Sequence, residues 1–177
     1  PPGLPEPSRT VRLGGMRKSI AGHMLGSLQR TAQLSYYLEL DVTEAQRLRR
    51  EASRKDDSGV TLAVVFIKAC AETLKRVPAL NSVLVGDDVH YFDQVNIGVA
   101  VALDEGLIVP VISNVGEMDI AAVSAATAEL AGKAKEGKLS PDDVVGGTFT
   151  ISVLGTVDGF TPILNASQSA ILGVGRS

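Results

Sequence analysis

The sequence lacks several residue types on which common kinds of protein site depend. It has no tryptophan, and only 4% of its 177 residues are aromatic, so its core must consist of valine, isoleucine, leucine and alanine. A single cysteine, Cys70, excludes an internal disulfide and a four-cysteine zinc site. Two histidines, His23 and His90, are too few for a histidine-rich metal centre. We therefore expect no metal cofactor.

Several longer sequence signals are missing as well. No apolar run reaches the roughly 18 residues that cross a bilayer, so we expect no membrane partner. The N-terminus has neither the positively charged region nor the apolar region of a signal peptide, which favours an intracellular location. The sequence contains no P-loop, no dinucleotide-binding glycine motif and no G-x-S-x-G elbow. A net charge of -3 argues against a nucleic-acid binder, whose surface is usually basic.

The remaining composition is that of an ordinary globular chain, with 45% hydrophobic and 21% charged residues. Helical spacing of apolar residues predicts helices over residues 16–31, 61–77 and 120–134, the last capped by Asp119. Thr43 and Gln46 have the spacing of a capping box, which predicts a short helix to about residue 53. A polar turn is expected over residues 54–59. Cys70 falls on the apolar helix 61–77, so we interpret it as a buried structural thiol.

Strand patterns are equally clear. Residues 36–42 alternate between apolar and polar side chains, which predicts a half-buried strand. A hairpin turn is predicted at residues 86–88. Further strands are predicted over residues 83–85, 89–91, 94–103, 107–112, 148–154 and 170–174. Patterns alone therefore predict a mixed α/β domain.

The first nine residues, PPGLPEPSR, contain four prolines and one acid. Proline removes backbone donors and favours extended geometry, as in interdomain linkers. We interpret residues 1–9 as the remnant of a linker, with a frayed terminus as the alternative.

A series of segments resembles the catalytic domain of dihydrolipoamide acyltransferases, the E2 components of 2-oxoacid dehydrogenase complexes. The series occurs in the family's order and covers nearly everything from residue 10 onward. Its members are GMRKSIAGHM (15–24), YYLELDVT (36–43), VPALNS (77–82), VNIGVAVALDEGLIVPVI (95–112), AGKAKEGKLSPDDVVGGTFTISVLG (131–155), FTPILNA (160–166) and AILGVG (170–175).

The resemblance implies a two-layer α/β sandwich with a mixed sheet, like that of chloramphenicol acetyltransferase. It implies that residues 10–177 are an acyltransferase catalytic domain that works as a homotrimer within a larger core. The implied reaction moves an acyl group between dihydrolipoamide and coenzyme A. The implied partners are a lipoyl domain and the E1 and E3 components, in a bacterial cytoplasm or a mitochondrial matrix.

The resemblance also assigns one catalytic residue. The family's F-T-I-S-x-L-G motif is residues 149–155 here, and its hydroxyl donor, which stabilises the oxyanion, falls on Ser152. The family's base is the histidine of a His-x-x-x-Asp-Gly motif, and neither His23 nor His90 lies in one. We expect the base in a C-terminal segment of the domain that this sequence lacks.

Two departures and two alternatives stay open. The loop after Gly155 is shorter than usual in the family, and Asn165-Ala166-Ser167 replaces a common Asn-Pro-Pro. The chain could instead be an inactive structural core of such a complex, or a free-standing acyltransferase that uses coenzyme A. The acyl group is not fixed by the sequence, although a pyruvate or branched-chain complex is favoured over a succinyl one.

Overall fold

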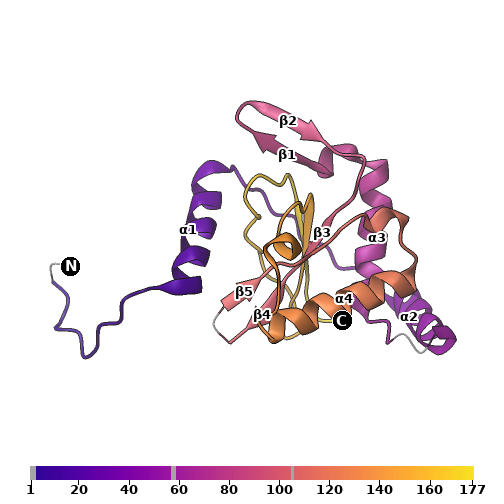
Figure 1. The fold of residues 1–177 in the computed structure, drawn as a ribbon, viewed down its shortest axis with the longest axis horizontal. Coiled ribbons are helices and arrows are strands. Elements are labelled where there is room, and N and C mark those ends of the chain that lie inside the picture. The colour runs from indigo at the N-terminus through magenta and orange to yellow at the C-terminus, as the bar shows by residue number, and fades with distance from the viewer. Residues whose placement is uncertain (1–2, 57–58, 105) are drawn as a thin grey trace.

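A four-stranded mixed sheet forms the centre of the molecule in the computed structural model, which describes residues 3–56, 59–104 and 106–177 (Figure 1). Its strands stand in the order β6-β3-β7-β8. β3 pairs antiparallel with β6 and parallel with β7, and β7 pairs parallel with β8. Their bounds are β3 Ile97–Val99, β6 Val111–Ile112, β7 Phe149–Val153 and β8 Ile171–Val174.

Two hairpins stand beside this sheet. One joins β1 (Ser82–Val85) to β2 (Asp88–Tyr91) through a turn in which Gly86 has φ +62°. The other joins β4 (Val101–Leu103) to β5 (Gly106–Ile108). Figure 1 shows the β1–β2 hairpin projecting from the body of the molecule. The hairpin predicted around residues 86–88 is confirmed.

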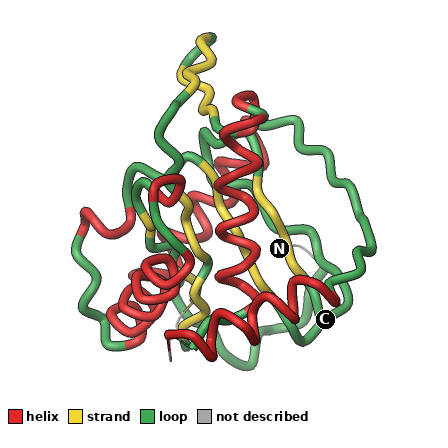
Figure 2. Tube along the Cα trace, turned by 90° about the vertical axis from the view of Figure 1, so that its right-hand side faces the viewer, coloured by secondary structure: helices red, strands yellow, loops and turns green. Residues whose placement is uncertain are grey.

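Helices α3 (Leu62–Arg76) and α4 (Ile120–Lys135) cover one face of the sheet, and α2 (Thr43–Asp56) packs against both of them. Figure 2 shows these helices in front of the strands. The core between the two layers includes the fully buried side chains of Val64, Ile67, Ile97, Val123 and Ile151. A two-layer α/β sandwich was predicted, and this packing confirms it.

The remaining elements are one long helix and three short ones. Helix α1 (Gly15–Arg30) stands apart from the body, beyond the β4–β5 hairpin (Figure 1). The 3-10 helices are η1 (Pro78–Leu80), η2 (Val115–Glu117) and η3 (Pro141–Val144). Within the described residues, no helix is long and apolar enough to cross a membrane.

Helix ends follow the sequence signals. The side chain of Thr61 accepts a hydrogen bond from the Val64 amide, and that of Asp119 accepts one from the Ala122 amide. These bonds satisfy donors that a helix N-terminus leaves open. Lys75 and Arg76 occupy the last turn of α3, where cations are favoured by the helix dipole. The predictions for α3 and α4 are therefore confirmed.

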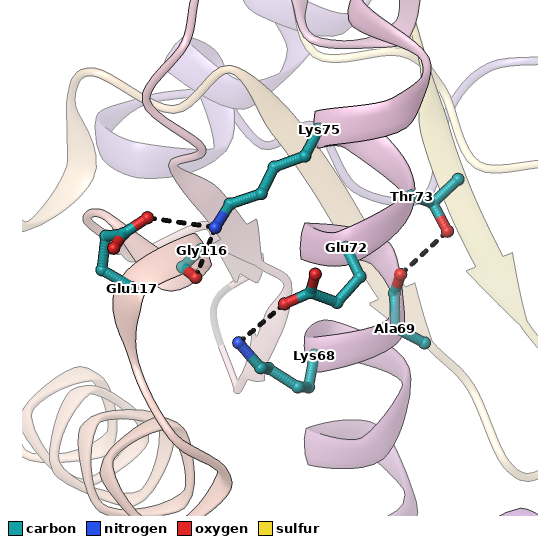
Figure 3. A network of polar contacts seen from close by, with 7 residues as sticks. All are labelled: Lys68, Ala69, Glu72, Thr73, Lys75, Gly116 and Glu117. Atoms are coloured by element: carbon teal, nitrogen blue, oxygen red, sulfur yellow. Dashed lines mark hydrogen bonds and ion pairs between the residues drawn. The ribbon is translucent and has the colours of Figure 1, made fainter.

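Lys75 also ties α3 to the turn that follows β6 (Figure 3). Its Nζ donates to the Gly116 carbonyl at 2.7 Å and lies 3.0 Å from Glu117 Oε1. A Cβ atom at Gly116 would lie 2.5 Å from the Lys75 Cε, so a larger residue there would require the end of the lysine side chain to move. The contact fixes the helical layer against the end of the sheet. A neighbouring ion pair, Lys68–Glu72, stays within α3.

The strand predicted over residues 36–42 is wrong. These residues are extended but belong to no strand, and Tyr36 and Leu38 are 84% and 83% exposed. A strand needs a neighbour for its backbone hydrogen bonds, and the described part of the chain offers none at this place. The alternating pattern is real, but Tyr36, Leu38 and Leu40 on its apolar side are left exposed.

Three smaller predictions also need correction. The long strand 94–103 is interrupted at Ala100, because β3 stays in the central sheet while β4 turns away to pair with β5. Asp41 rather than Thr43 caps α2, since its carboxylate accepts from the Thr43 amide at 2.8 Å. α2 continues to Asp56, so residues 54–56 of the expected turn are helical, and residues 57–58 lie outside the described residues.

Candidate active site

Ser152 lies near the end of β7, on the face of the sheet opposite the helices. Along β7 the side chains of Phe149 and Ile151 enter the core under α3 and α4. Because side chains alternate along a strand, Thr150 and Ser152 point to the other face. Ser152 is half-buried, and within the described part of the chain its hydroxyl makes no hydrogen bond. It is therefore free to donate to a bound molecule.

The residue beside Ser152 in the sheet is Gly173 of β8. A Cβ atom at Gly173 would lie 3.0 Å from Pro162 Cδ and 3.4 Å from Phe160 Cζ. The loop around residues 160–162 therefore packs directly on β8 next to Ser152. A side chain at this position would require Pro162 to move by a few tenths of an ångström. Ser152 and Gly173 form one side of the site on the sheet, and the loop around residues 160–162 forms the other side.

This loop is held by the N-terminal part of the chain. The Ser27 hydroxyl donates to the Leu164 carbonyl at 2.6 Å, and the Leu164 amide donates to the Gln33 side chain at 3.3 Å. The hydroxyls of Tyr37 and Thr161 are also hydrogen-bonded. The extended residues 33–37 thus run along the loop that flanks Ser152. The sequence did not predict this contact, which joins segments more than 120 residues apart.

A buried polar pair fixes β7 below Ser152. The Thr150 hydroxyl donates to Gln168 Oε1 at 2.6 Å, and Gln168 Nε2 donates to the Gly147 carbonyl at 2.9 Å. Both side chains are almost fully buried. Thr150 points to the same face as Ser152, so this pair holds the strand in register with the segment that precedes β8. The sequence analysis did not identify the Thr150–Gln168 pair. The position of Thr150 two residues before Ser152 on one strand was the available signal that both face the same side.

The histidines and the cysteine lie elsewhere. His23 is exposed on α1 and His90 is exposed on β2, and neither contacts Ser152. Cys70 lies on the packed side of α3, where burial raises the pKa of its thiol to about 11. A thiol with this pKa is protonated at neutral pH and is a poor nucleophile. Cys70 is partly rather than fully buried, and its packing against the core is consistent with the predicted structural role.

Two open cavities lie away from Ser152. One, of about 400 Å³, lies between α1 and the β4–β5 hairpin and is lined by Arg17, Ile20, Leu103 and Asp104 among others. The other, of about 550 Å³, lies between residues 40–43, α2 and Ser177. Among the described residues, no group of three or more histidine, cysteine or acidic side chains could hold a metal ion.

Comparison with known proteins decides the family. Residues 5–177 match the family described as 2-oxoacid dehydrogenases acyltransferase (catalytic domain). The chain belongs to this family. The match begins at residue 5, within the stretch interpreted as a linker.

Curated relatives of this acyltransferase domain are longer proteins. The chain is 38% identical over 178 residues to the dihydrolipoyllysine-residue succinyltransferase component of the 2-oxoglutarate dehydrogenase complex of Rickettsia typhi. It is 34% identical to the mitochondrial protein of the same name from Saccharomyces cerevisiae. These alignments cover 97% of the chain but 45% and 38% of the relatives, so the chain spans less than half of their length.

Solved structures confirm the fold of an acyltransferase core. A probable dihydrolipoamide acetyltransferase from Listeria monocytogenes is 36% identical, with a TM-score of 0.88 over 96% of this chain and 75% of that one. The cubic core of a pyruvate dehydrogenase multienzyme complex is 33% identical, with a TM-score of 0.88 over 99% and 78%. A third structure, the Azotobacter vinelandii dihydrolipoamide acetyltransferase, was solved to investigate the catalytic roles of a serine, a histidine and an asparagine (34% identity, TM-score 0.89, 99% and 78%).

Proposed function

We propose that the protein to which this chain belongs transfers an acyl group between coenzyme A and a dihydrolipoyl group. In this proposal Ser152 stabilises the oxyanion. The observation that carries it is the half-buried Ser152 hydroxyl, which is uncommitted and lies at the end of the strand that matches the family's motif. The curated relatives and solved structures named above support it, because their names describe acyl transfer to a dihydrolipoyl group.

The chemistry explains why such a hydroxyl is needed. A base removes the proton of the coenzyme A thiol, and the sulfur attacks the thioester carbonyl of the acyl-dihydrolipoyl group. As the new carbon–sulfur bond forms, the carbonyl electrons move to oxygen and create an oxyanion. The Ser152 hydroxyl donates a hydrogen bond to this oxygen, an interaction worth about 10²–10³ in rate. The carbonyl then re-forms, and the dihydrolipoyl sulfur leaves and takes the proton.

The general base is proposed to lie outside these 177 residues. Base catalysis of this kind contributes roughly 10²–10⁴ in rate, so an active enzyme needs one. His23 and His90 are both exposed, and neither lies on β7, β8 or the loop beside Ser152. We propose that residues 10–177 belong to a catalytic domain whose histidine and aspartate lie in a further C-terminal segment. We also propose that residues 1–9 are a linker remnant, although the family match begins at residue 5.

The proposal includes an assembly. We propose a homotrimer within a larger oligomeric core that receives a lipoyl domain and the E1 and E3 components. Two of the similar solved structures are described as cores of multienzyme complexes, which supports core formation. The alternative is a structural core of the same shape without catalytic activity, and an activity assay distinguishes it from an active acyltransferase.

The test is an acyl-transfer assay on the full-length protein with dihydrolipoamide and acyl-coenzyme A. Acetyl, isobutyryl and succinyl donors are compared by kcat/KM, because the sequence favours the first two while the curated relatives carry succinyl in their names. Transfer from one of these donors supports the proposal. An assembled protein that transfers none of them would establish the scaffold instead.

A further inference from the structure

The chain separates its charges along the sequence to an unusual degree. Residues 7–38 contain five arginines and lysines and no acid. Residues 77–132 contain eight acids and no arginine or lysine. The first stretch forms α1 and its flanks, and the second includes the β1–β2 hairpin. Three of the eight acids, Asp87, Asp88 and Asp93, lie on the hairpin or directly after it, so α1 and the hairpin, which are separate in Figure 1, carry opposite charges.

The basic projection also exposes apolar side chains. Arg12, Lys18 and Arg30 are exposed on α1 or just before it. Met16, Leu25 and Leu28 are 40%, 57% and 51% exposed on the same helix. We call these six residues the basic surface. Helix α1 contacts β5 and, through the buried Ser27, the loop at Leu164, but most of its residues are exposed.

The acidic projection has the same mixed character. Asp87, Asp88 and Asp93 are exposed at the tip and at the end of the β1–β2 hairpin. Leu84 and Val89 face each other across the two strands, and with Tyr91 they form an exposed apolar stripe on one face. We call these six residues the acidic surface. Backbone hydrogen bonds join β1 to residues 167–169 of the same chain, but they leave this apolar stripe exposed, and an exposed apolar patch rimmed by charges is typical of an interaction surface.

From these observations we infer that the acidic surface of one copy of this chain docks on the basic surface of a second copy. A symmetric contact of either surface with itself would place like charges together, which is costly. The contact is therefore heterologous, and heterologous contacts between identical chains form a closed ring when the rotation that relates the copies closes, as the proposed trimer requires. This inference rests on the proposed assembly of the protein, for which it names the surfaces.

The test uses charge reversal in the full-length protein, followed by sedimentation equilibrium. The acidic variant is Asp87→Lys with Asp88→Lys, and the basic variant is Arg12→Glu with Lys18→Glu. Lys18 lies in the first turn of α1, where glutamate suits the helix dipole, so this change does not weaken the helix. Lys138→Glu is the matched control, because Lys138 is an exposed cation outside both surfaces.

We expect either reversed variant to raise the dissociation constant of the assembly by about tenfold or more, while the control does not. Combining both reversals in one chain should restore assembly, and added salt should weaken the wild-type assembly. If the reversals cost solubility, Leu84→Ser and Leu28→Ser give the same comparison without a charge change. An assembled wild type that none of these variants weakens would overturn the named surfaces alone. A monomeric wild type would overturn the proposed assembly as well.

Discussion

Strand β7 and residues 36–42 both alternate between apolar and polar side chains, but they differ in what covers them. Ile151 of β7 is fully buried between the sheet and its helices, whereas Leu38 is 83% exposed in an extended segment. Both residues lie in stretches that alternate as a strand does. The difference shows that a periodic pattern identifies the side chains suited to burial. Whether they are buried depends on which other segments of the fold pack against them.

The contrast predicts a large loss of stability from a truncation in the core. Ile67→Ala truncates a fully buried side chain of α3, and this change creates a cavity between the packed helices and the sheet. We expect a loss of about 2–5 kcal/mol in the free energy of unfolding, measured by chemical denaturation. A loss below 1 kcal/mol would mean that the helical layer does not pack as described.

A capping residue should have a smaller effect. Asp119→Ala removes the side chain that accepts from the Ala122 amide at the start of α4. We expect this change to lower the free energy of unfolding by about 0.5–2 kcal/mol. Asp119→Asn is the control, because asparagine keeps an accepting oxygen and should restore most of the loss.

The capping box at η3 makes a pH-dependent contribution. Hydrogen bonds from the backbone amide and then the hydroxyl of Ser140 lower the pKa of Asp143. A lowered pKa in the folded state stabilises the fold above the ordinary value near 3.8, and this contribution is lost as the pH falls through the folded value. Ser140→Ala should therefore destabilise the protein at neutral pH and have less effect under strongly acidic conditions. An effect that grows with acidity would contradict this assignment.

The smallest effect is expected in the uncovered segment. Leu38→Ala makes a truncation comparable to that of Ile67→Ala, but at an exposed position. At protein concentrations where the chain is monomeric, we expect a change within about 0.5 kcal/mol. A loss comparable to that of Ile67→Ala would show that residues 36–42 are covered within one folded chain, and would erase the contrast between the two regions.

The sequence predicts the parts of the fold that depend on local signals. Asp119 caps α4 as predicted, and Gly86 forms the predicted hairpin turn. Prediction from the sequence fails where the structure of a segment depends on contacts with residues that are distant in the sequence. Residues 36–42 have a strand pattern but no partner strand among the described residues. The apolar run 94–103 divides into two strands because β3 pairs with β7 whereas β4 pairs with β5.

The candidate site divides in the same way. Ser152 follows from the motif in residues 149–155, because a motif is local. The contacts that surround it could not be predicted, since Tyr37 with Thr161 and Ser27 with Leu164 join segments that only the fold brings together. Gly173 was part of a motif, but its reason emerges only from its place beside Ser152 under Pro162.

The central claim is that the Ser152 hydroxyl acts on the transition state of acyl transfer. The most direct measurement is kcat and KM for Ser152→Ala in the full-length protein, with Ser53→Ala of α2 as a half-buried control serine. We predict that Ser152→Ala lowers kcat by about 10²–10³ with little change in KM or in thermal stability, and that the control matches the wild type. Unchanged kcat in folded Ser152→Ala would contradict the claim.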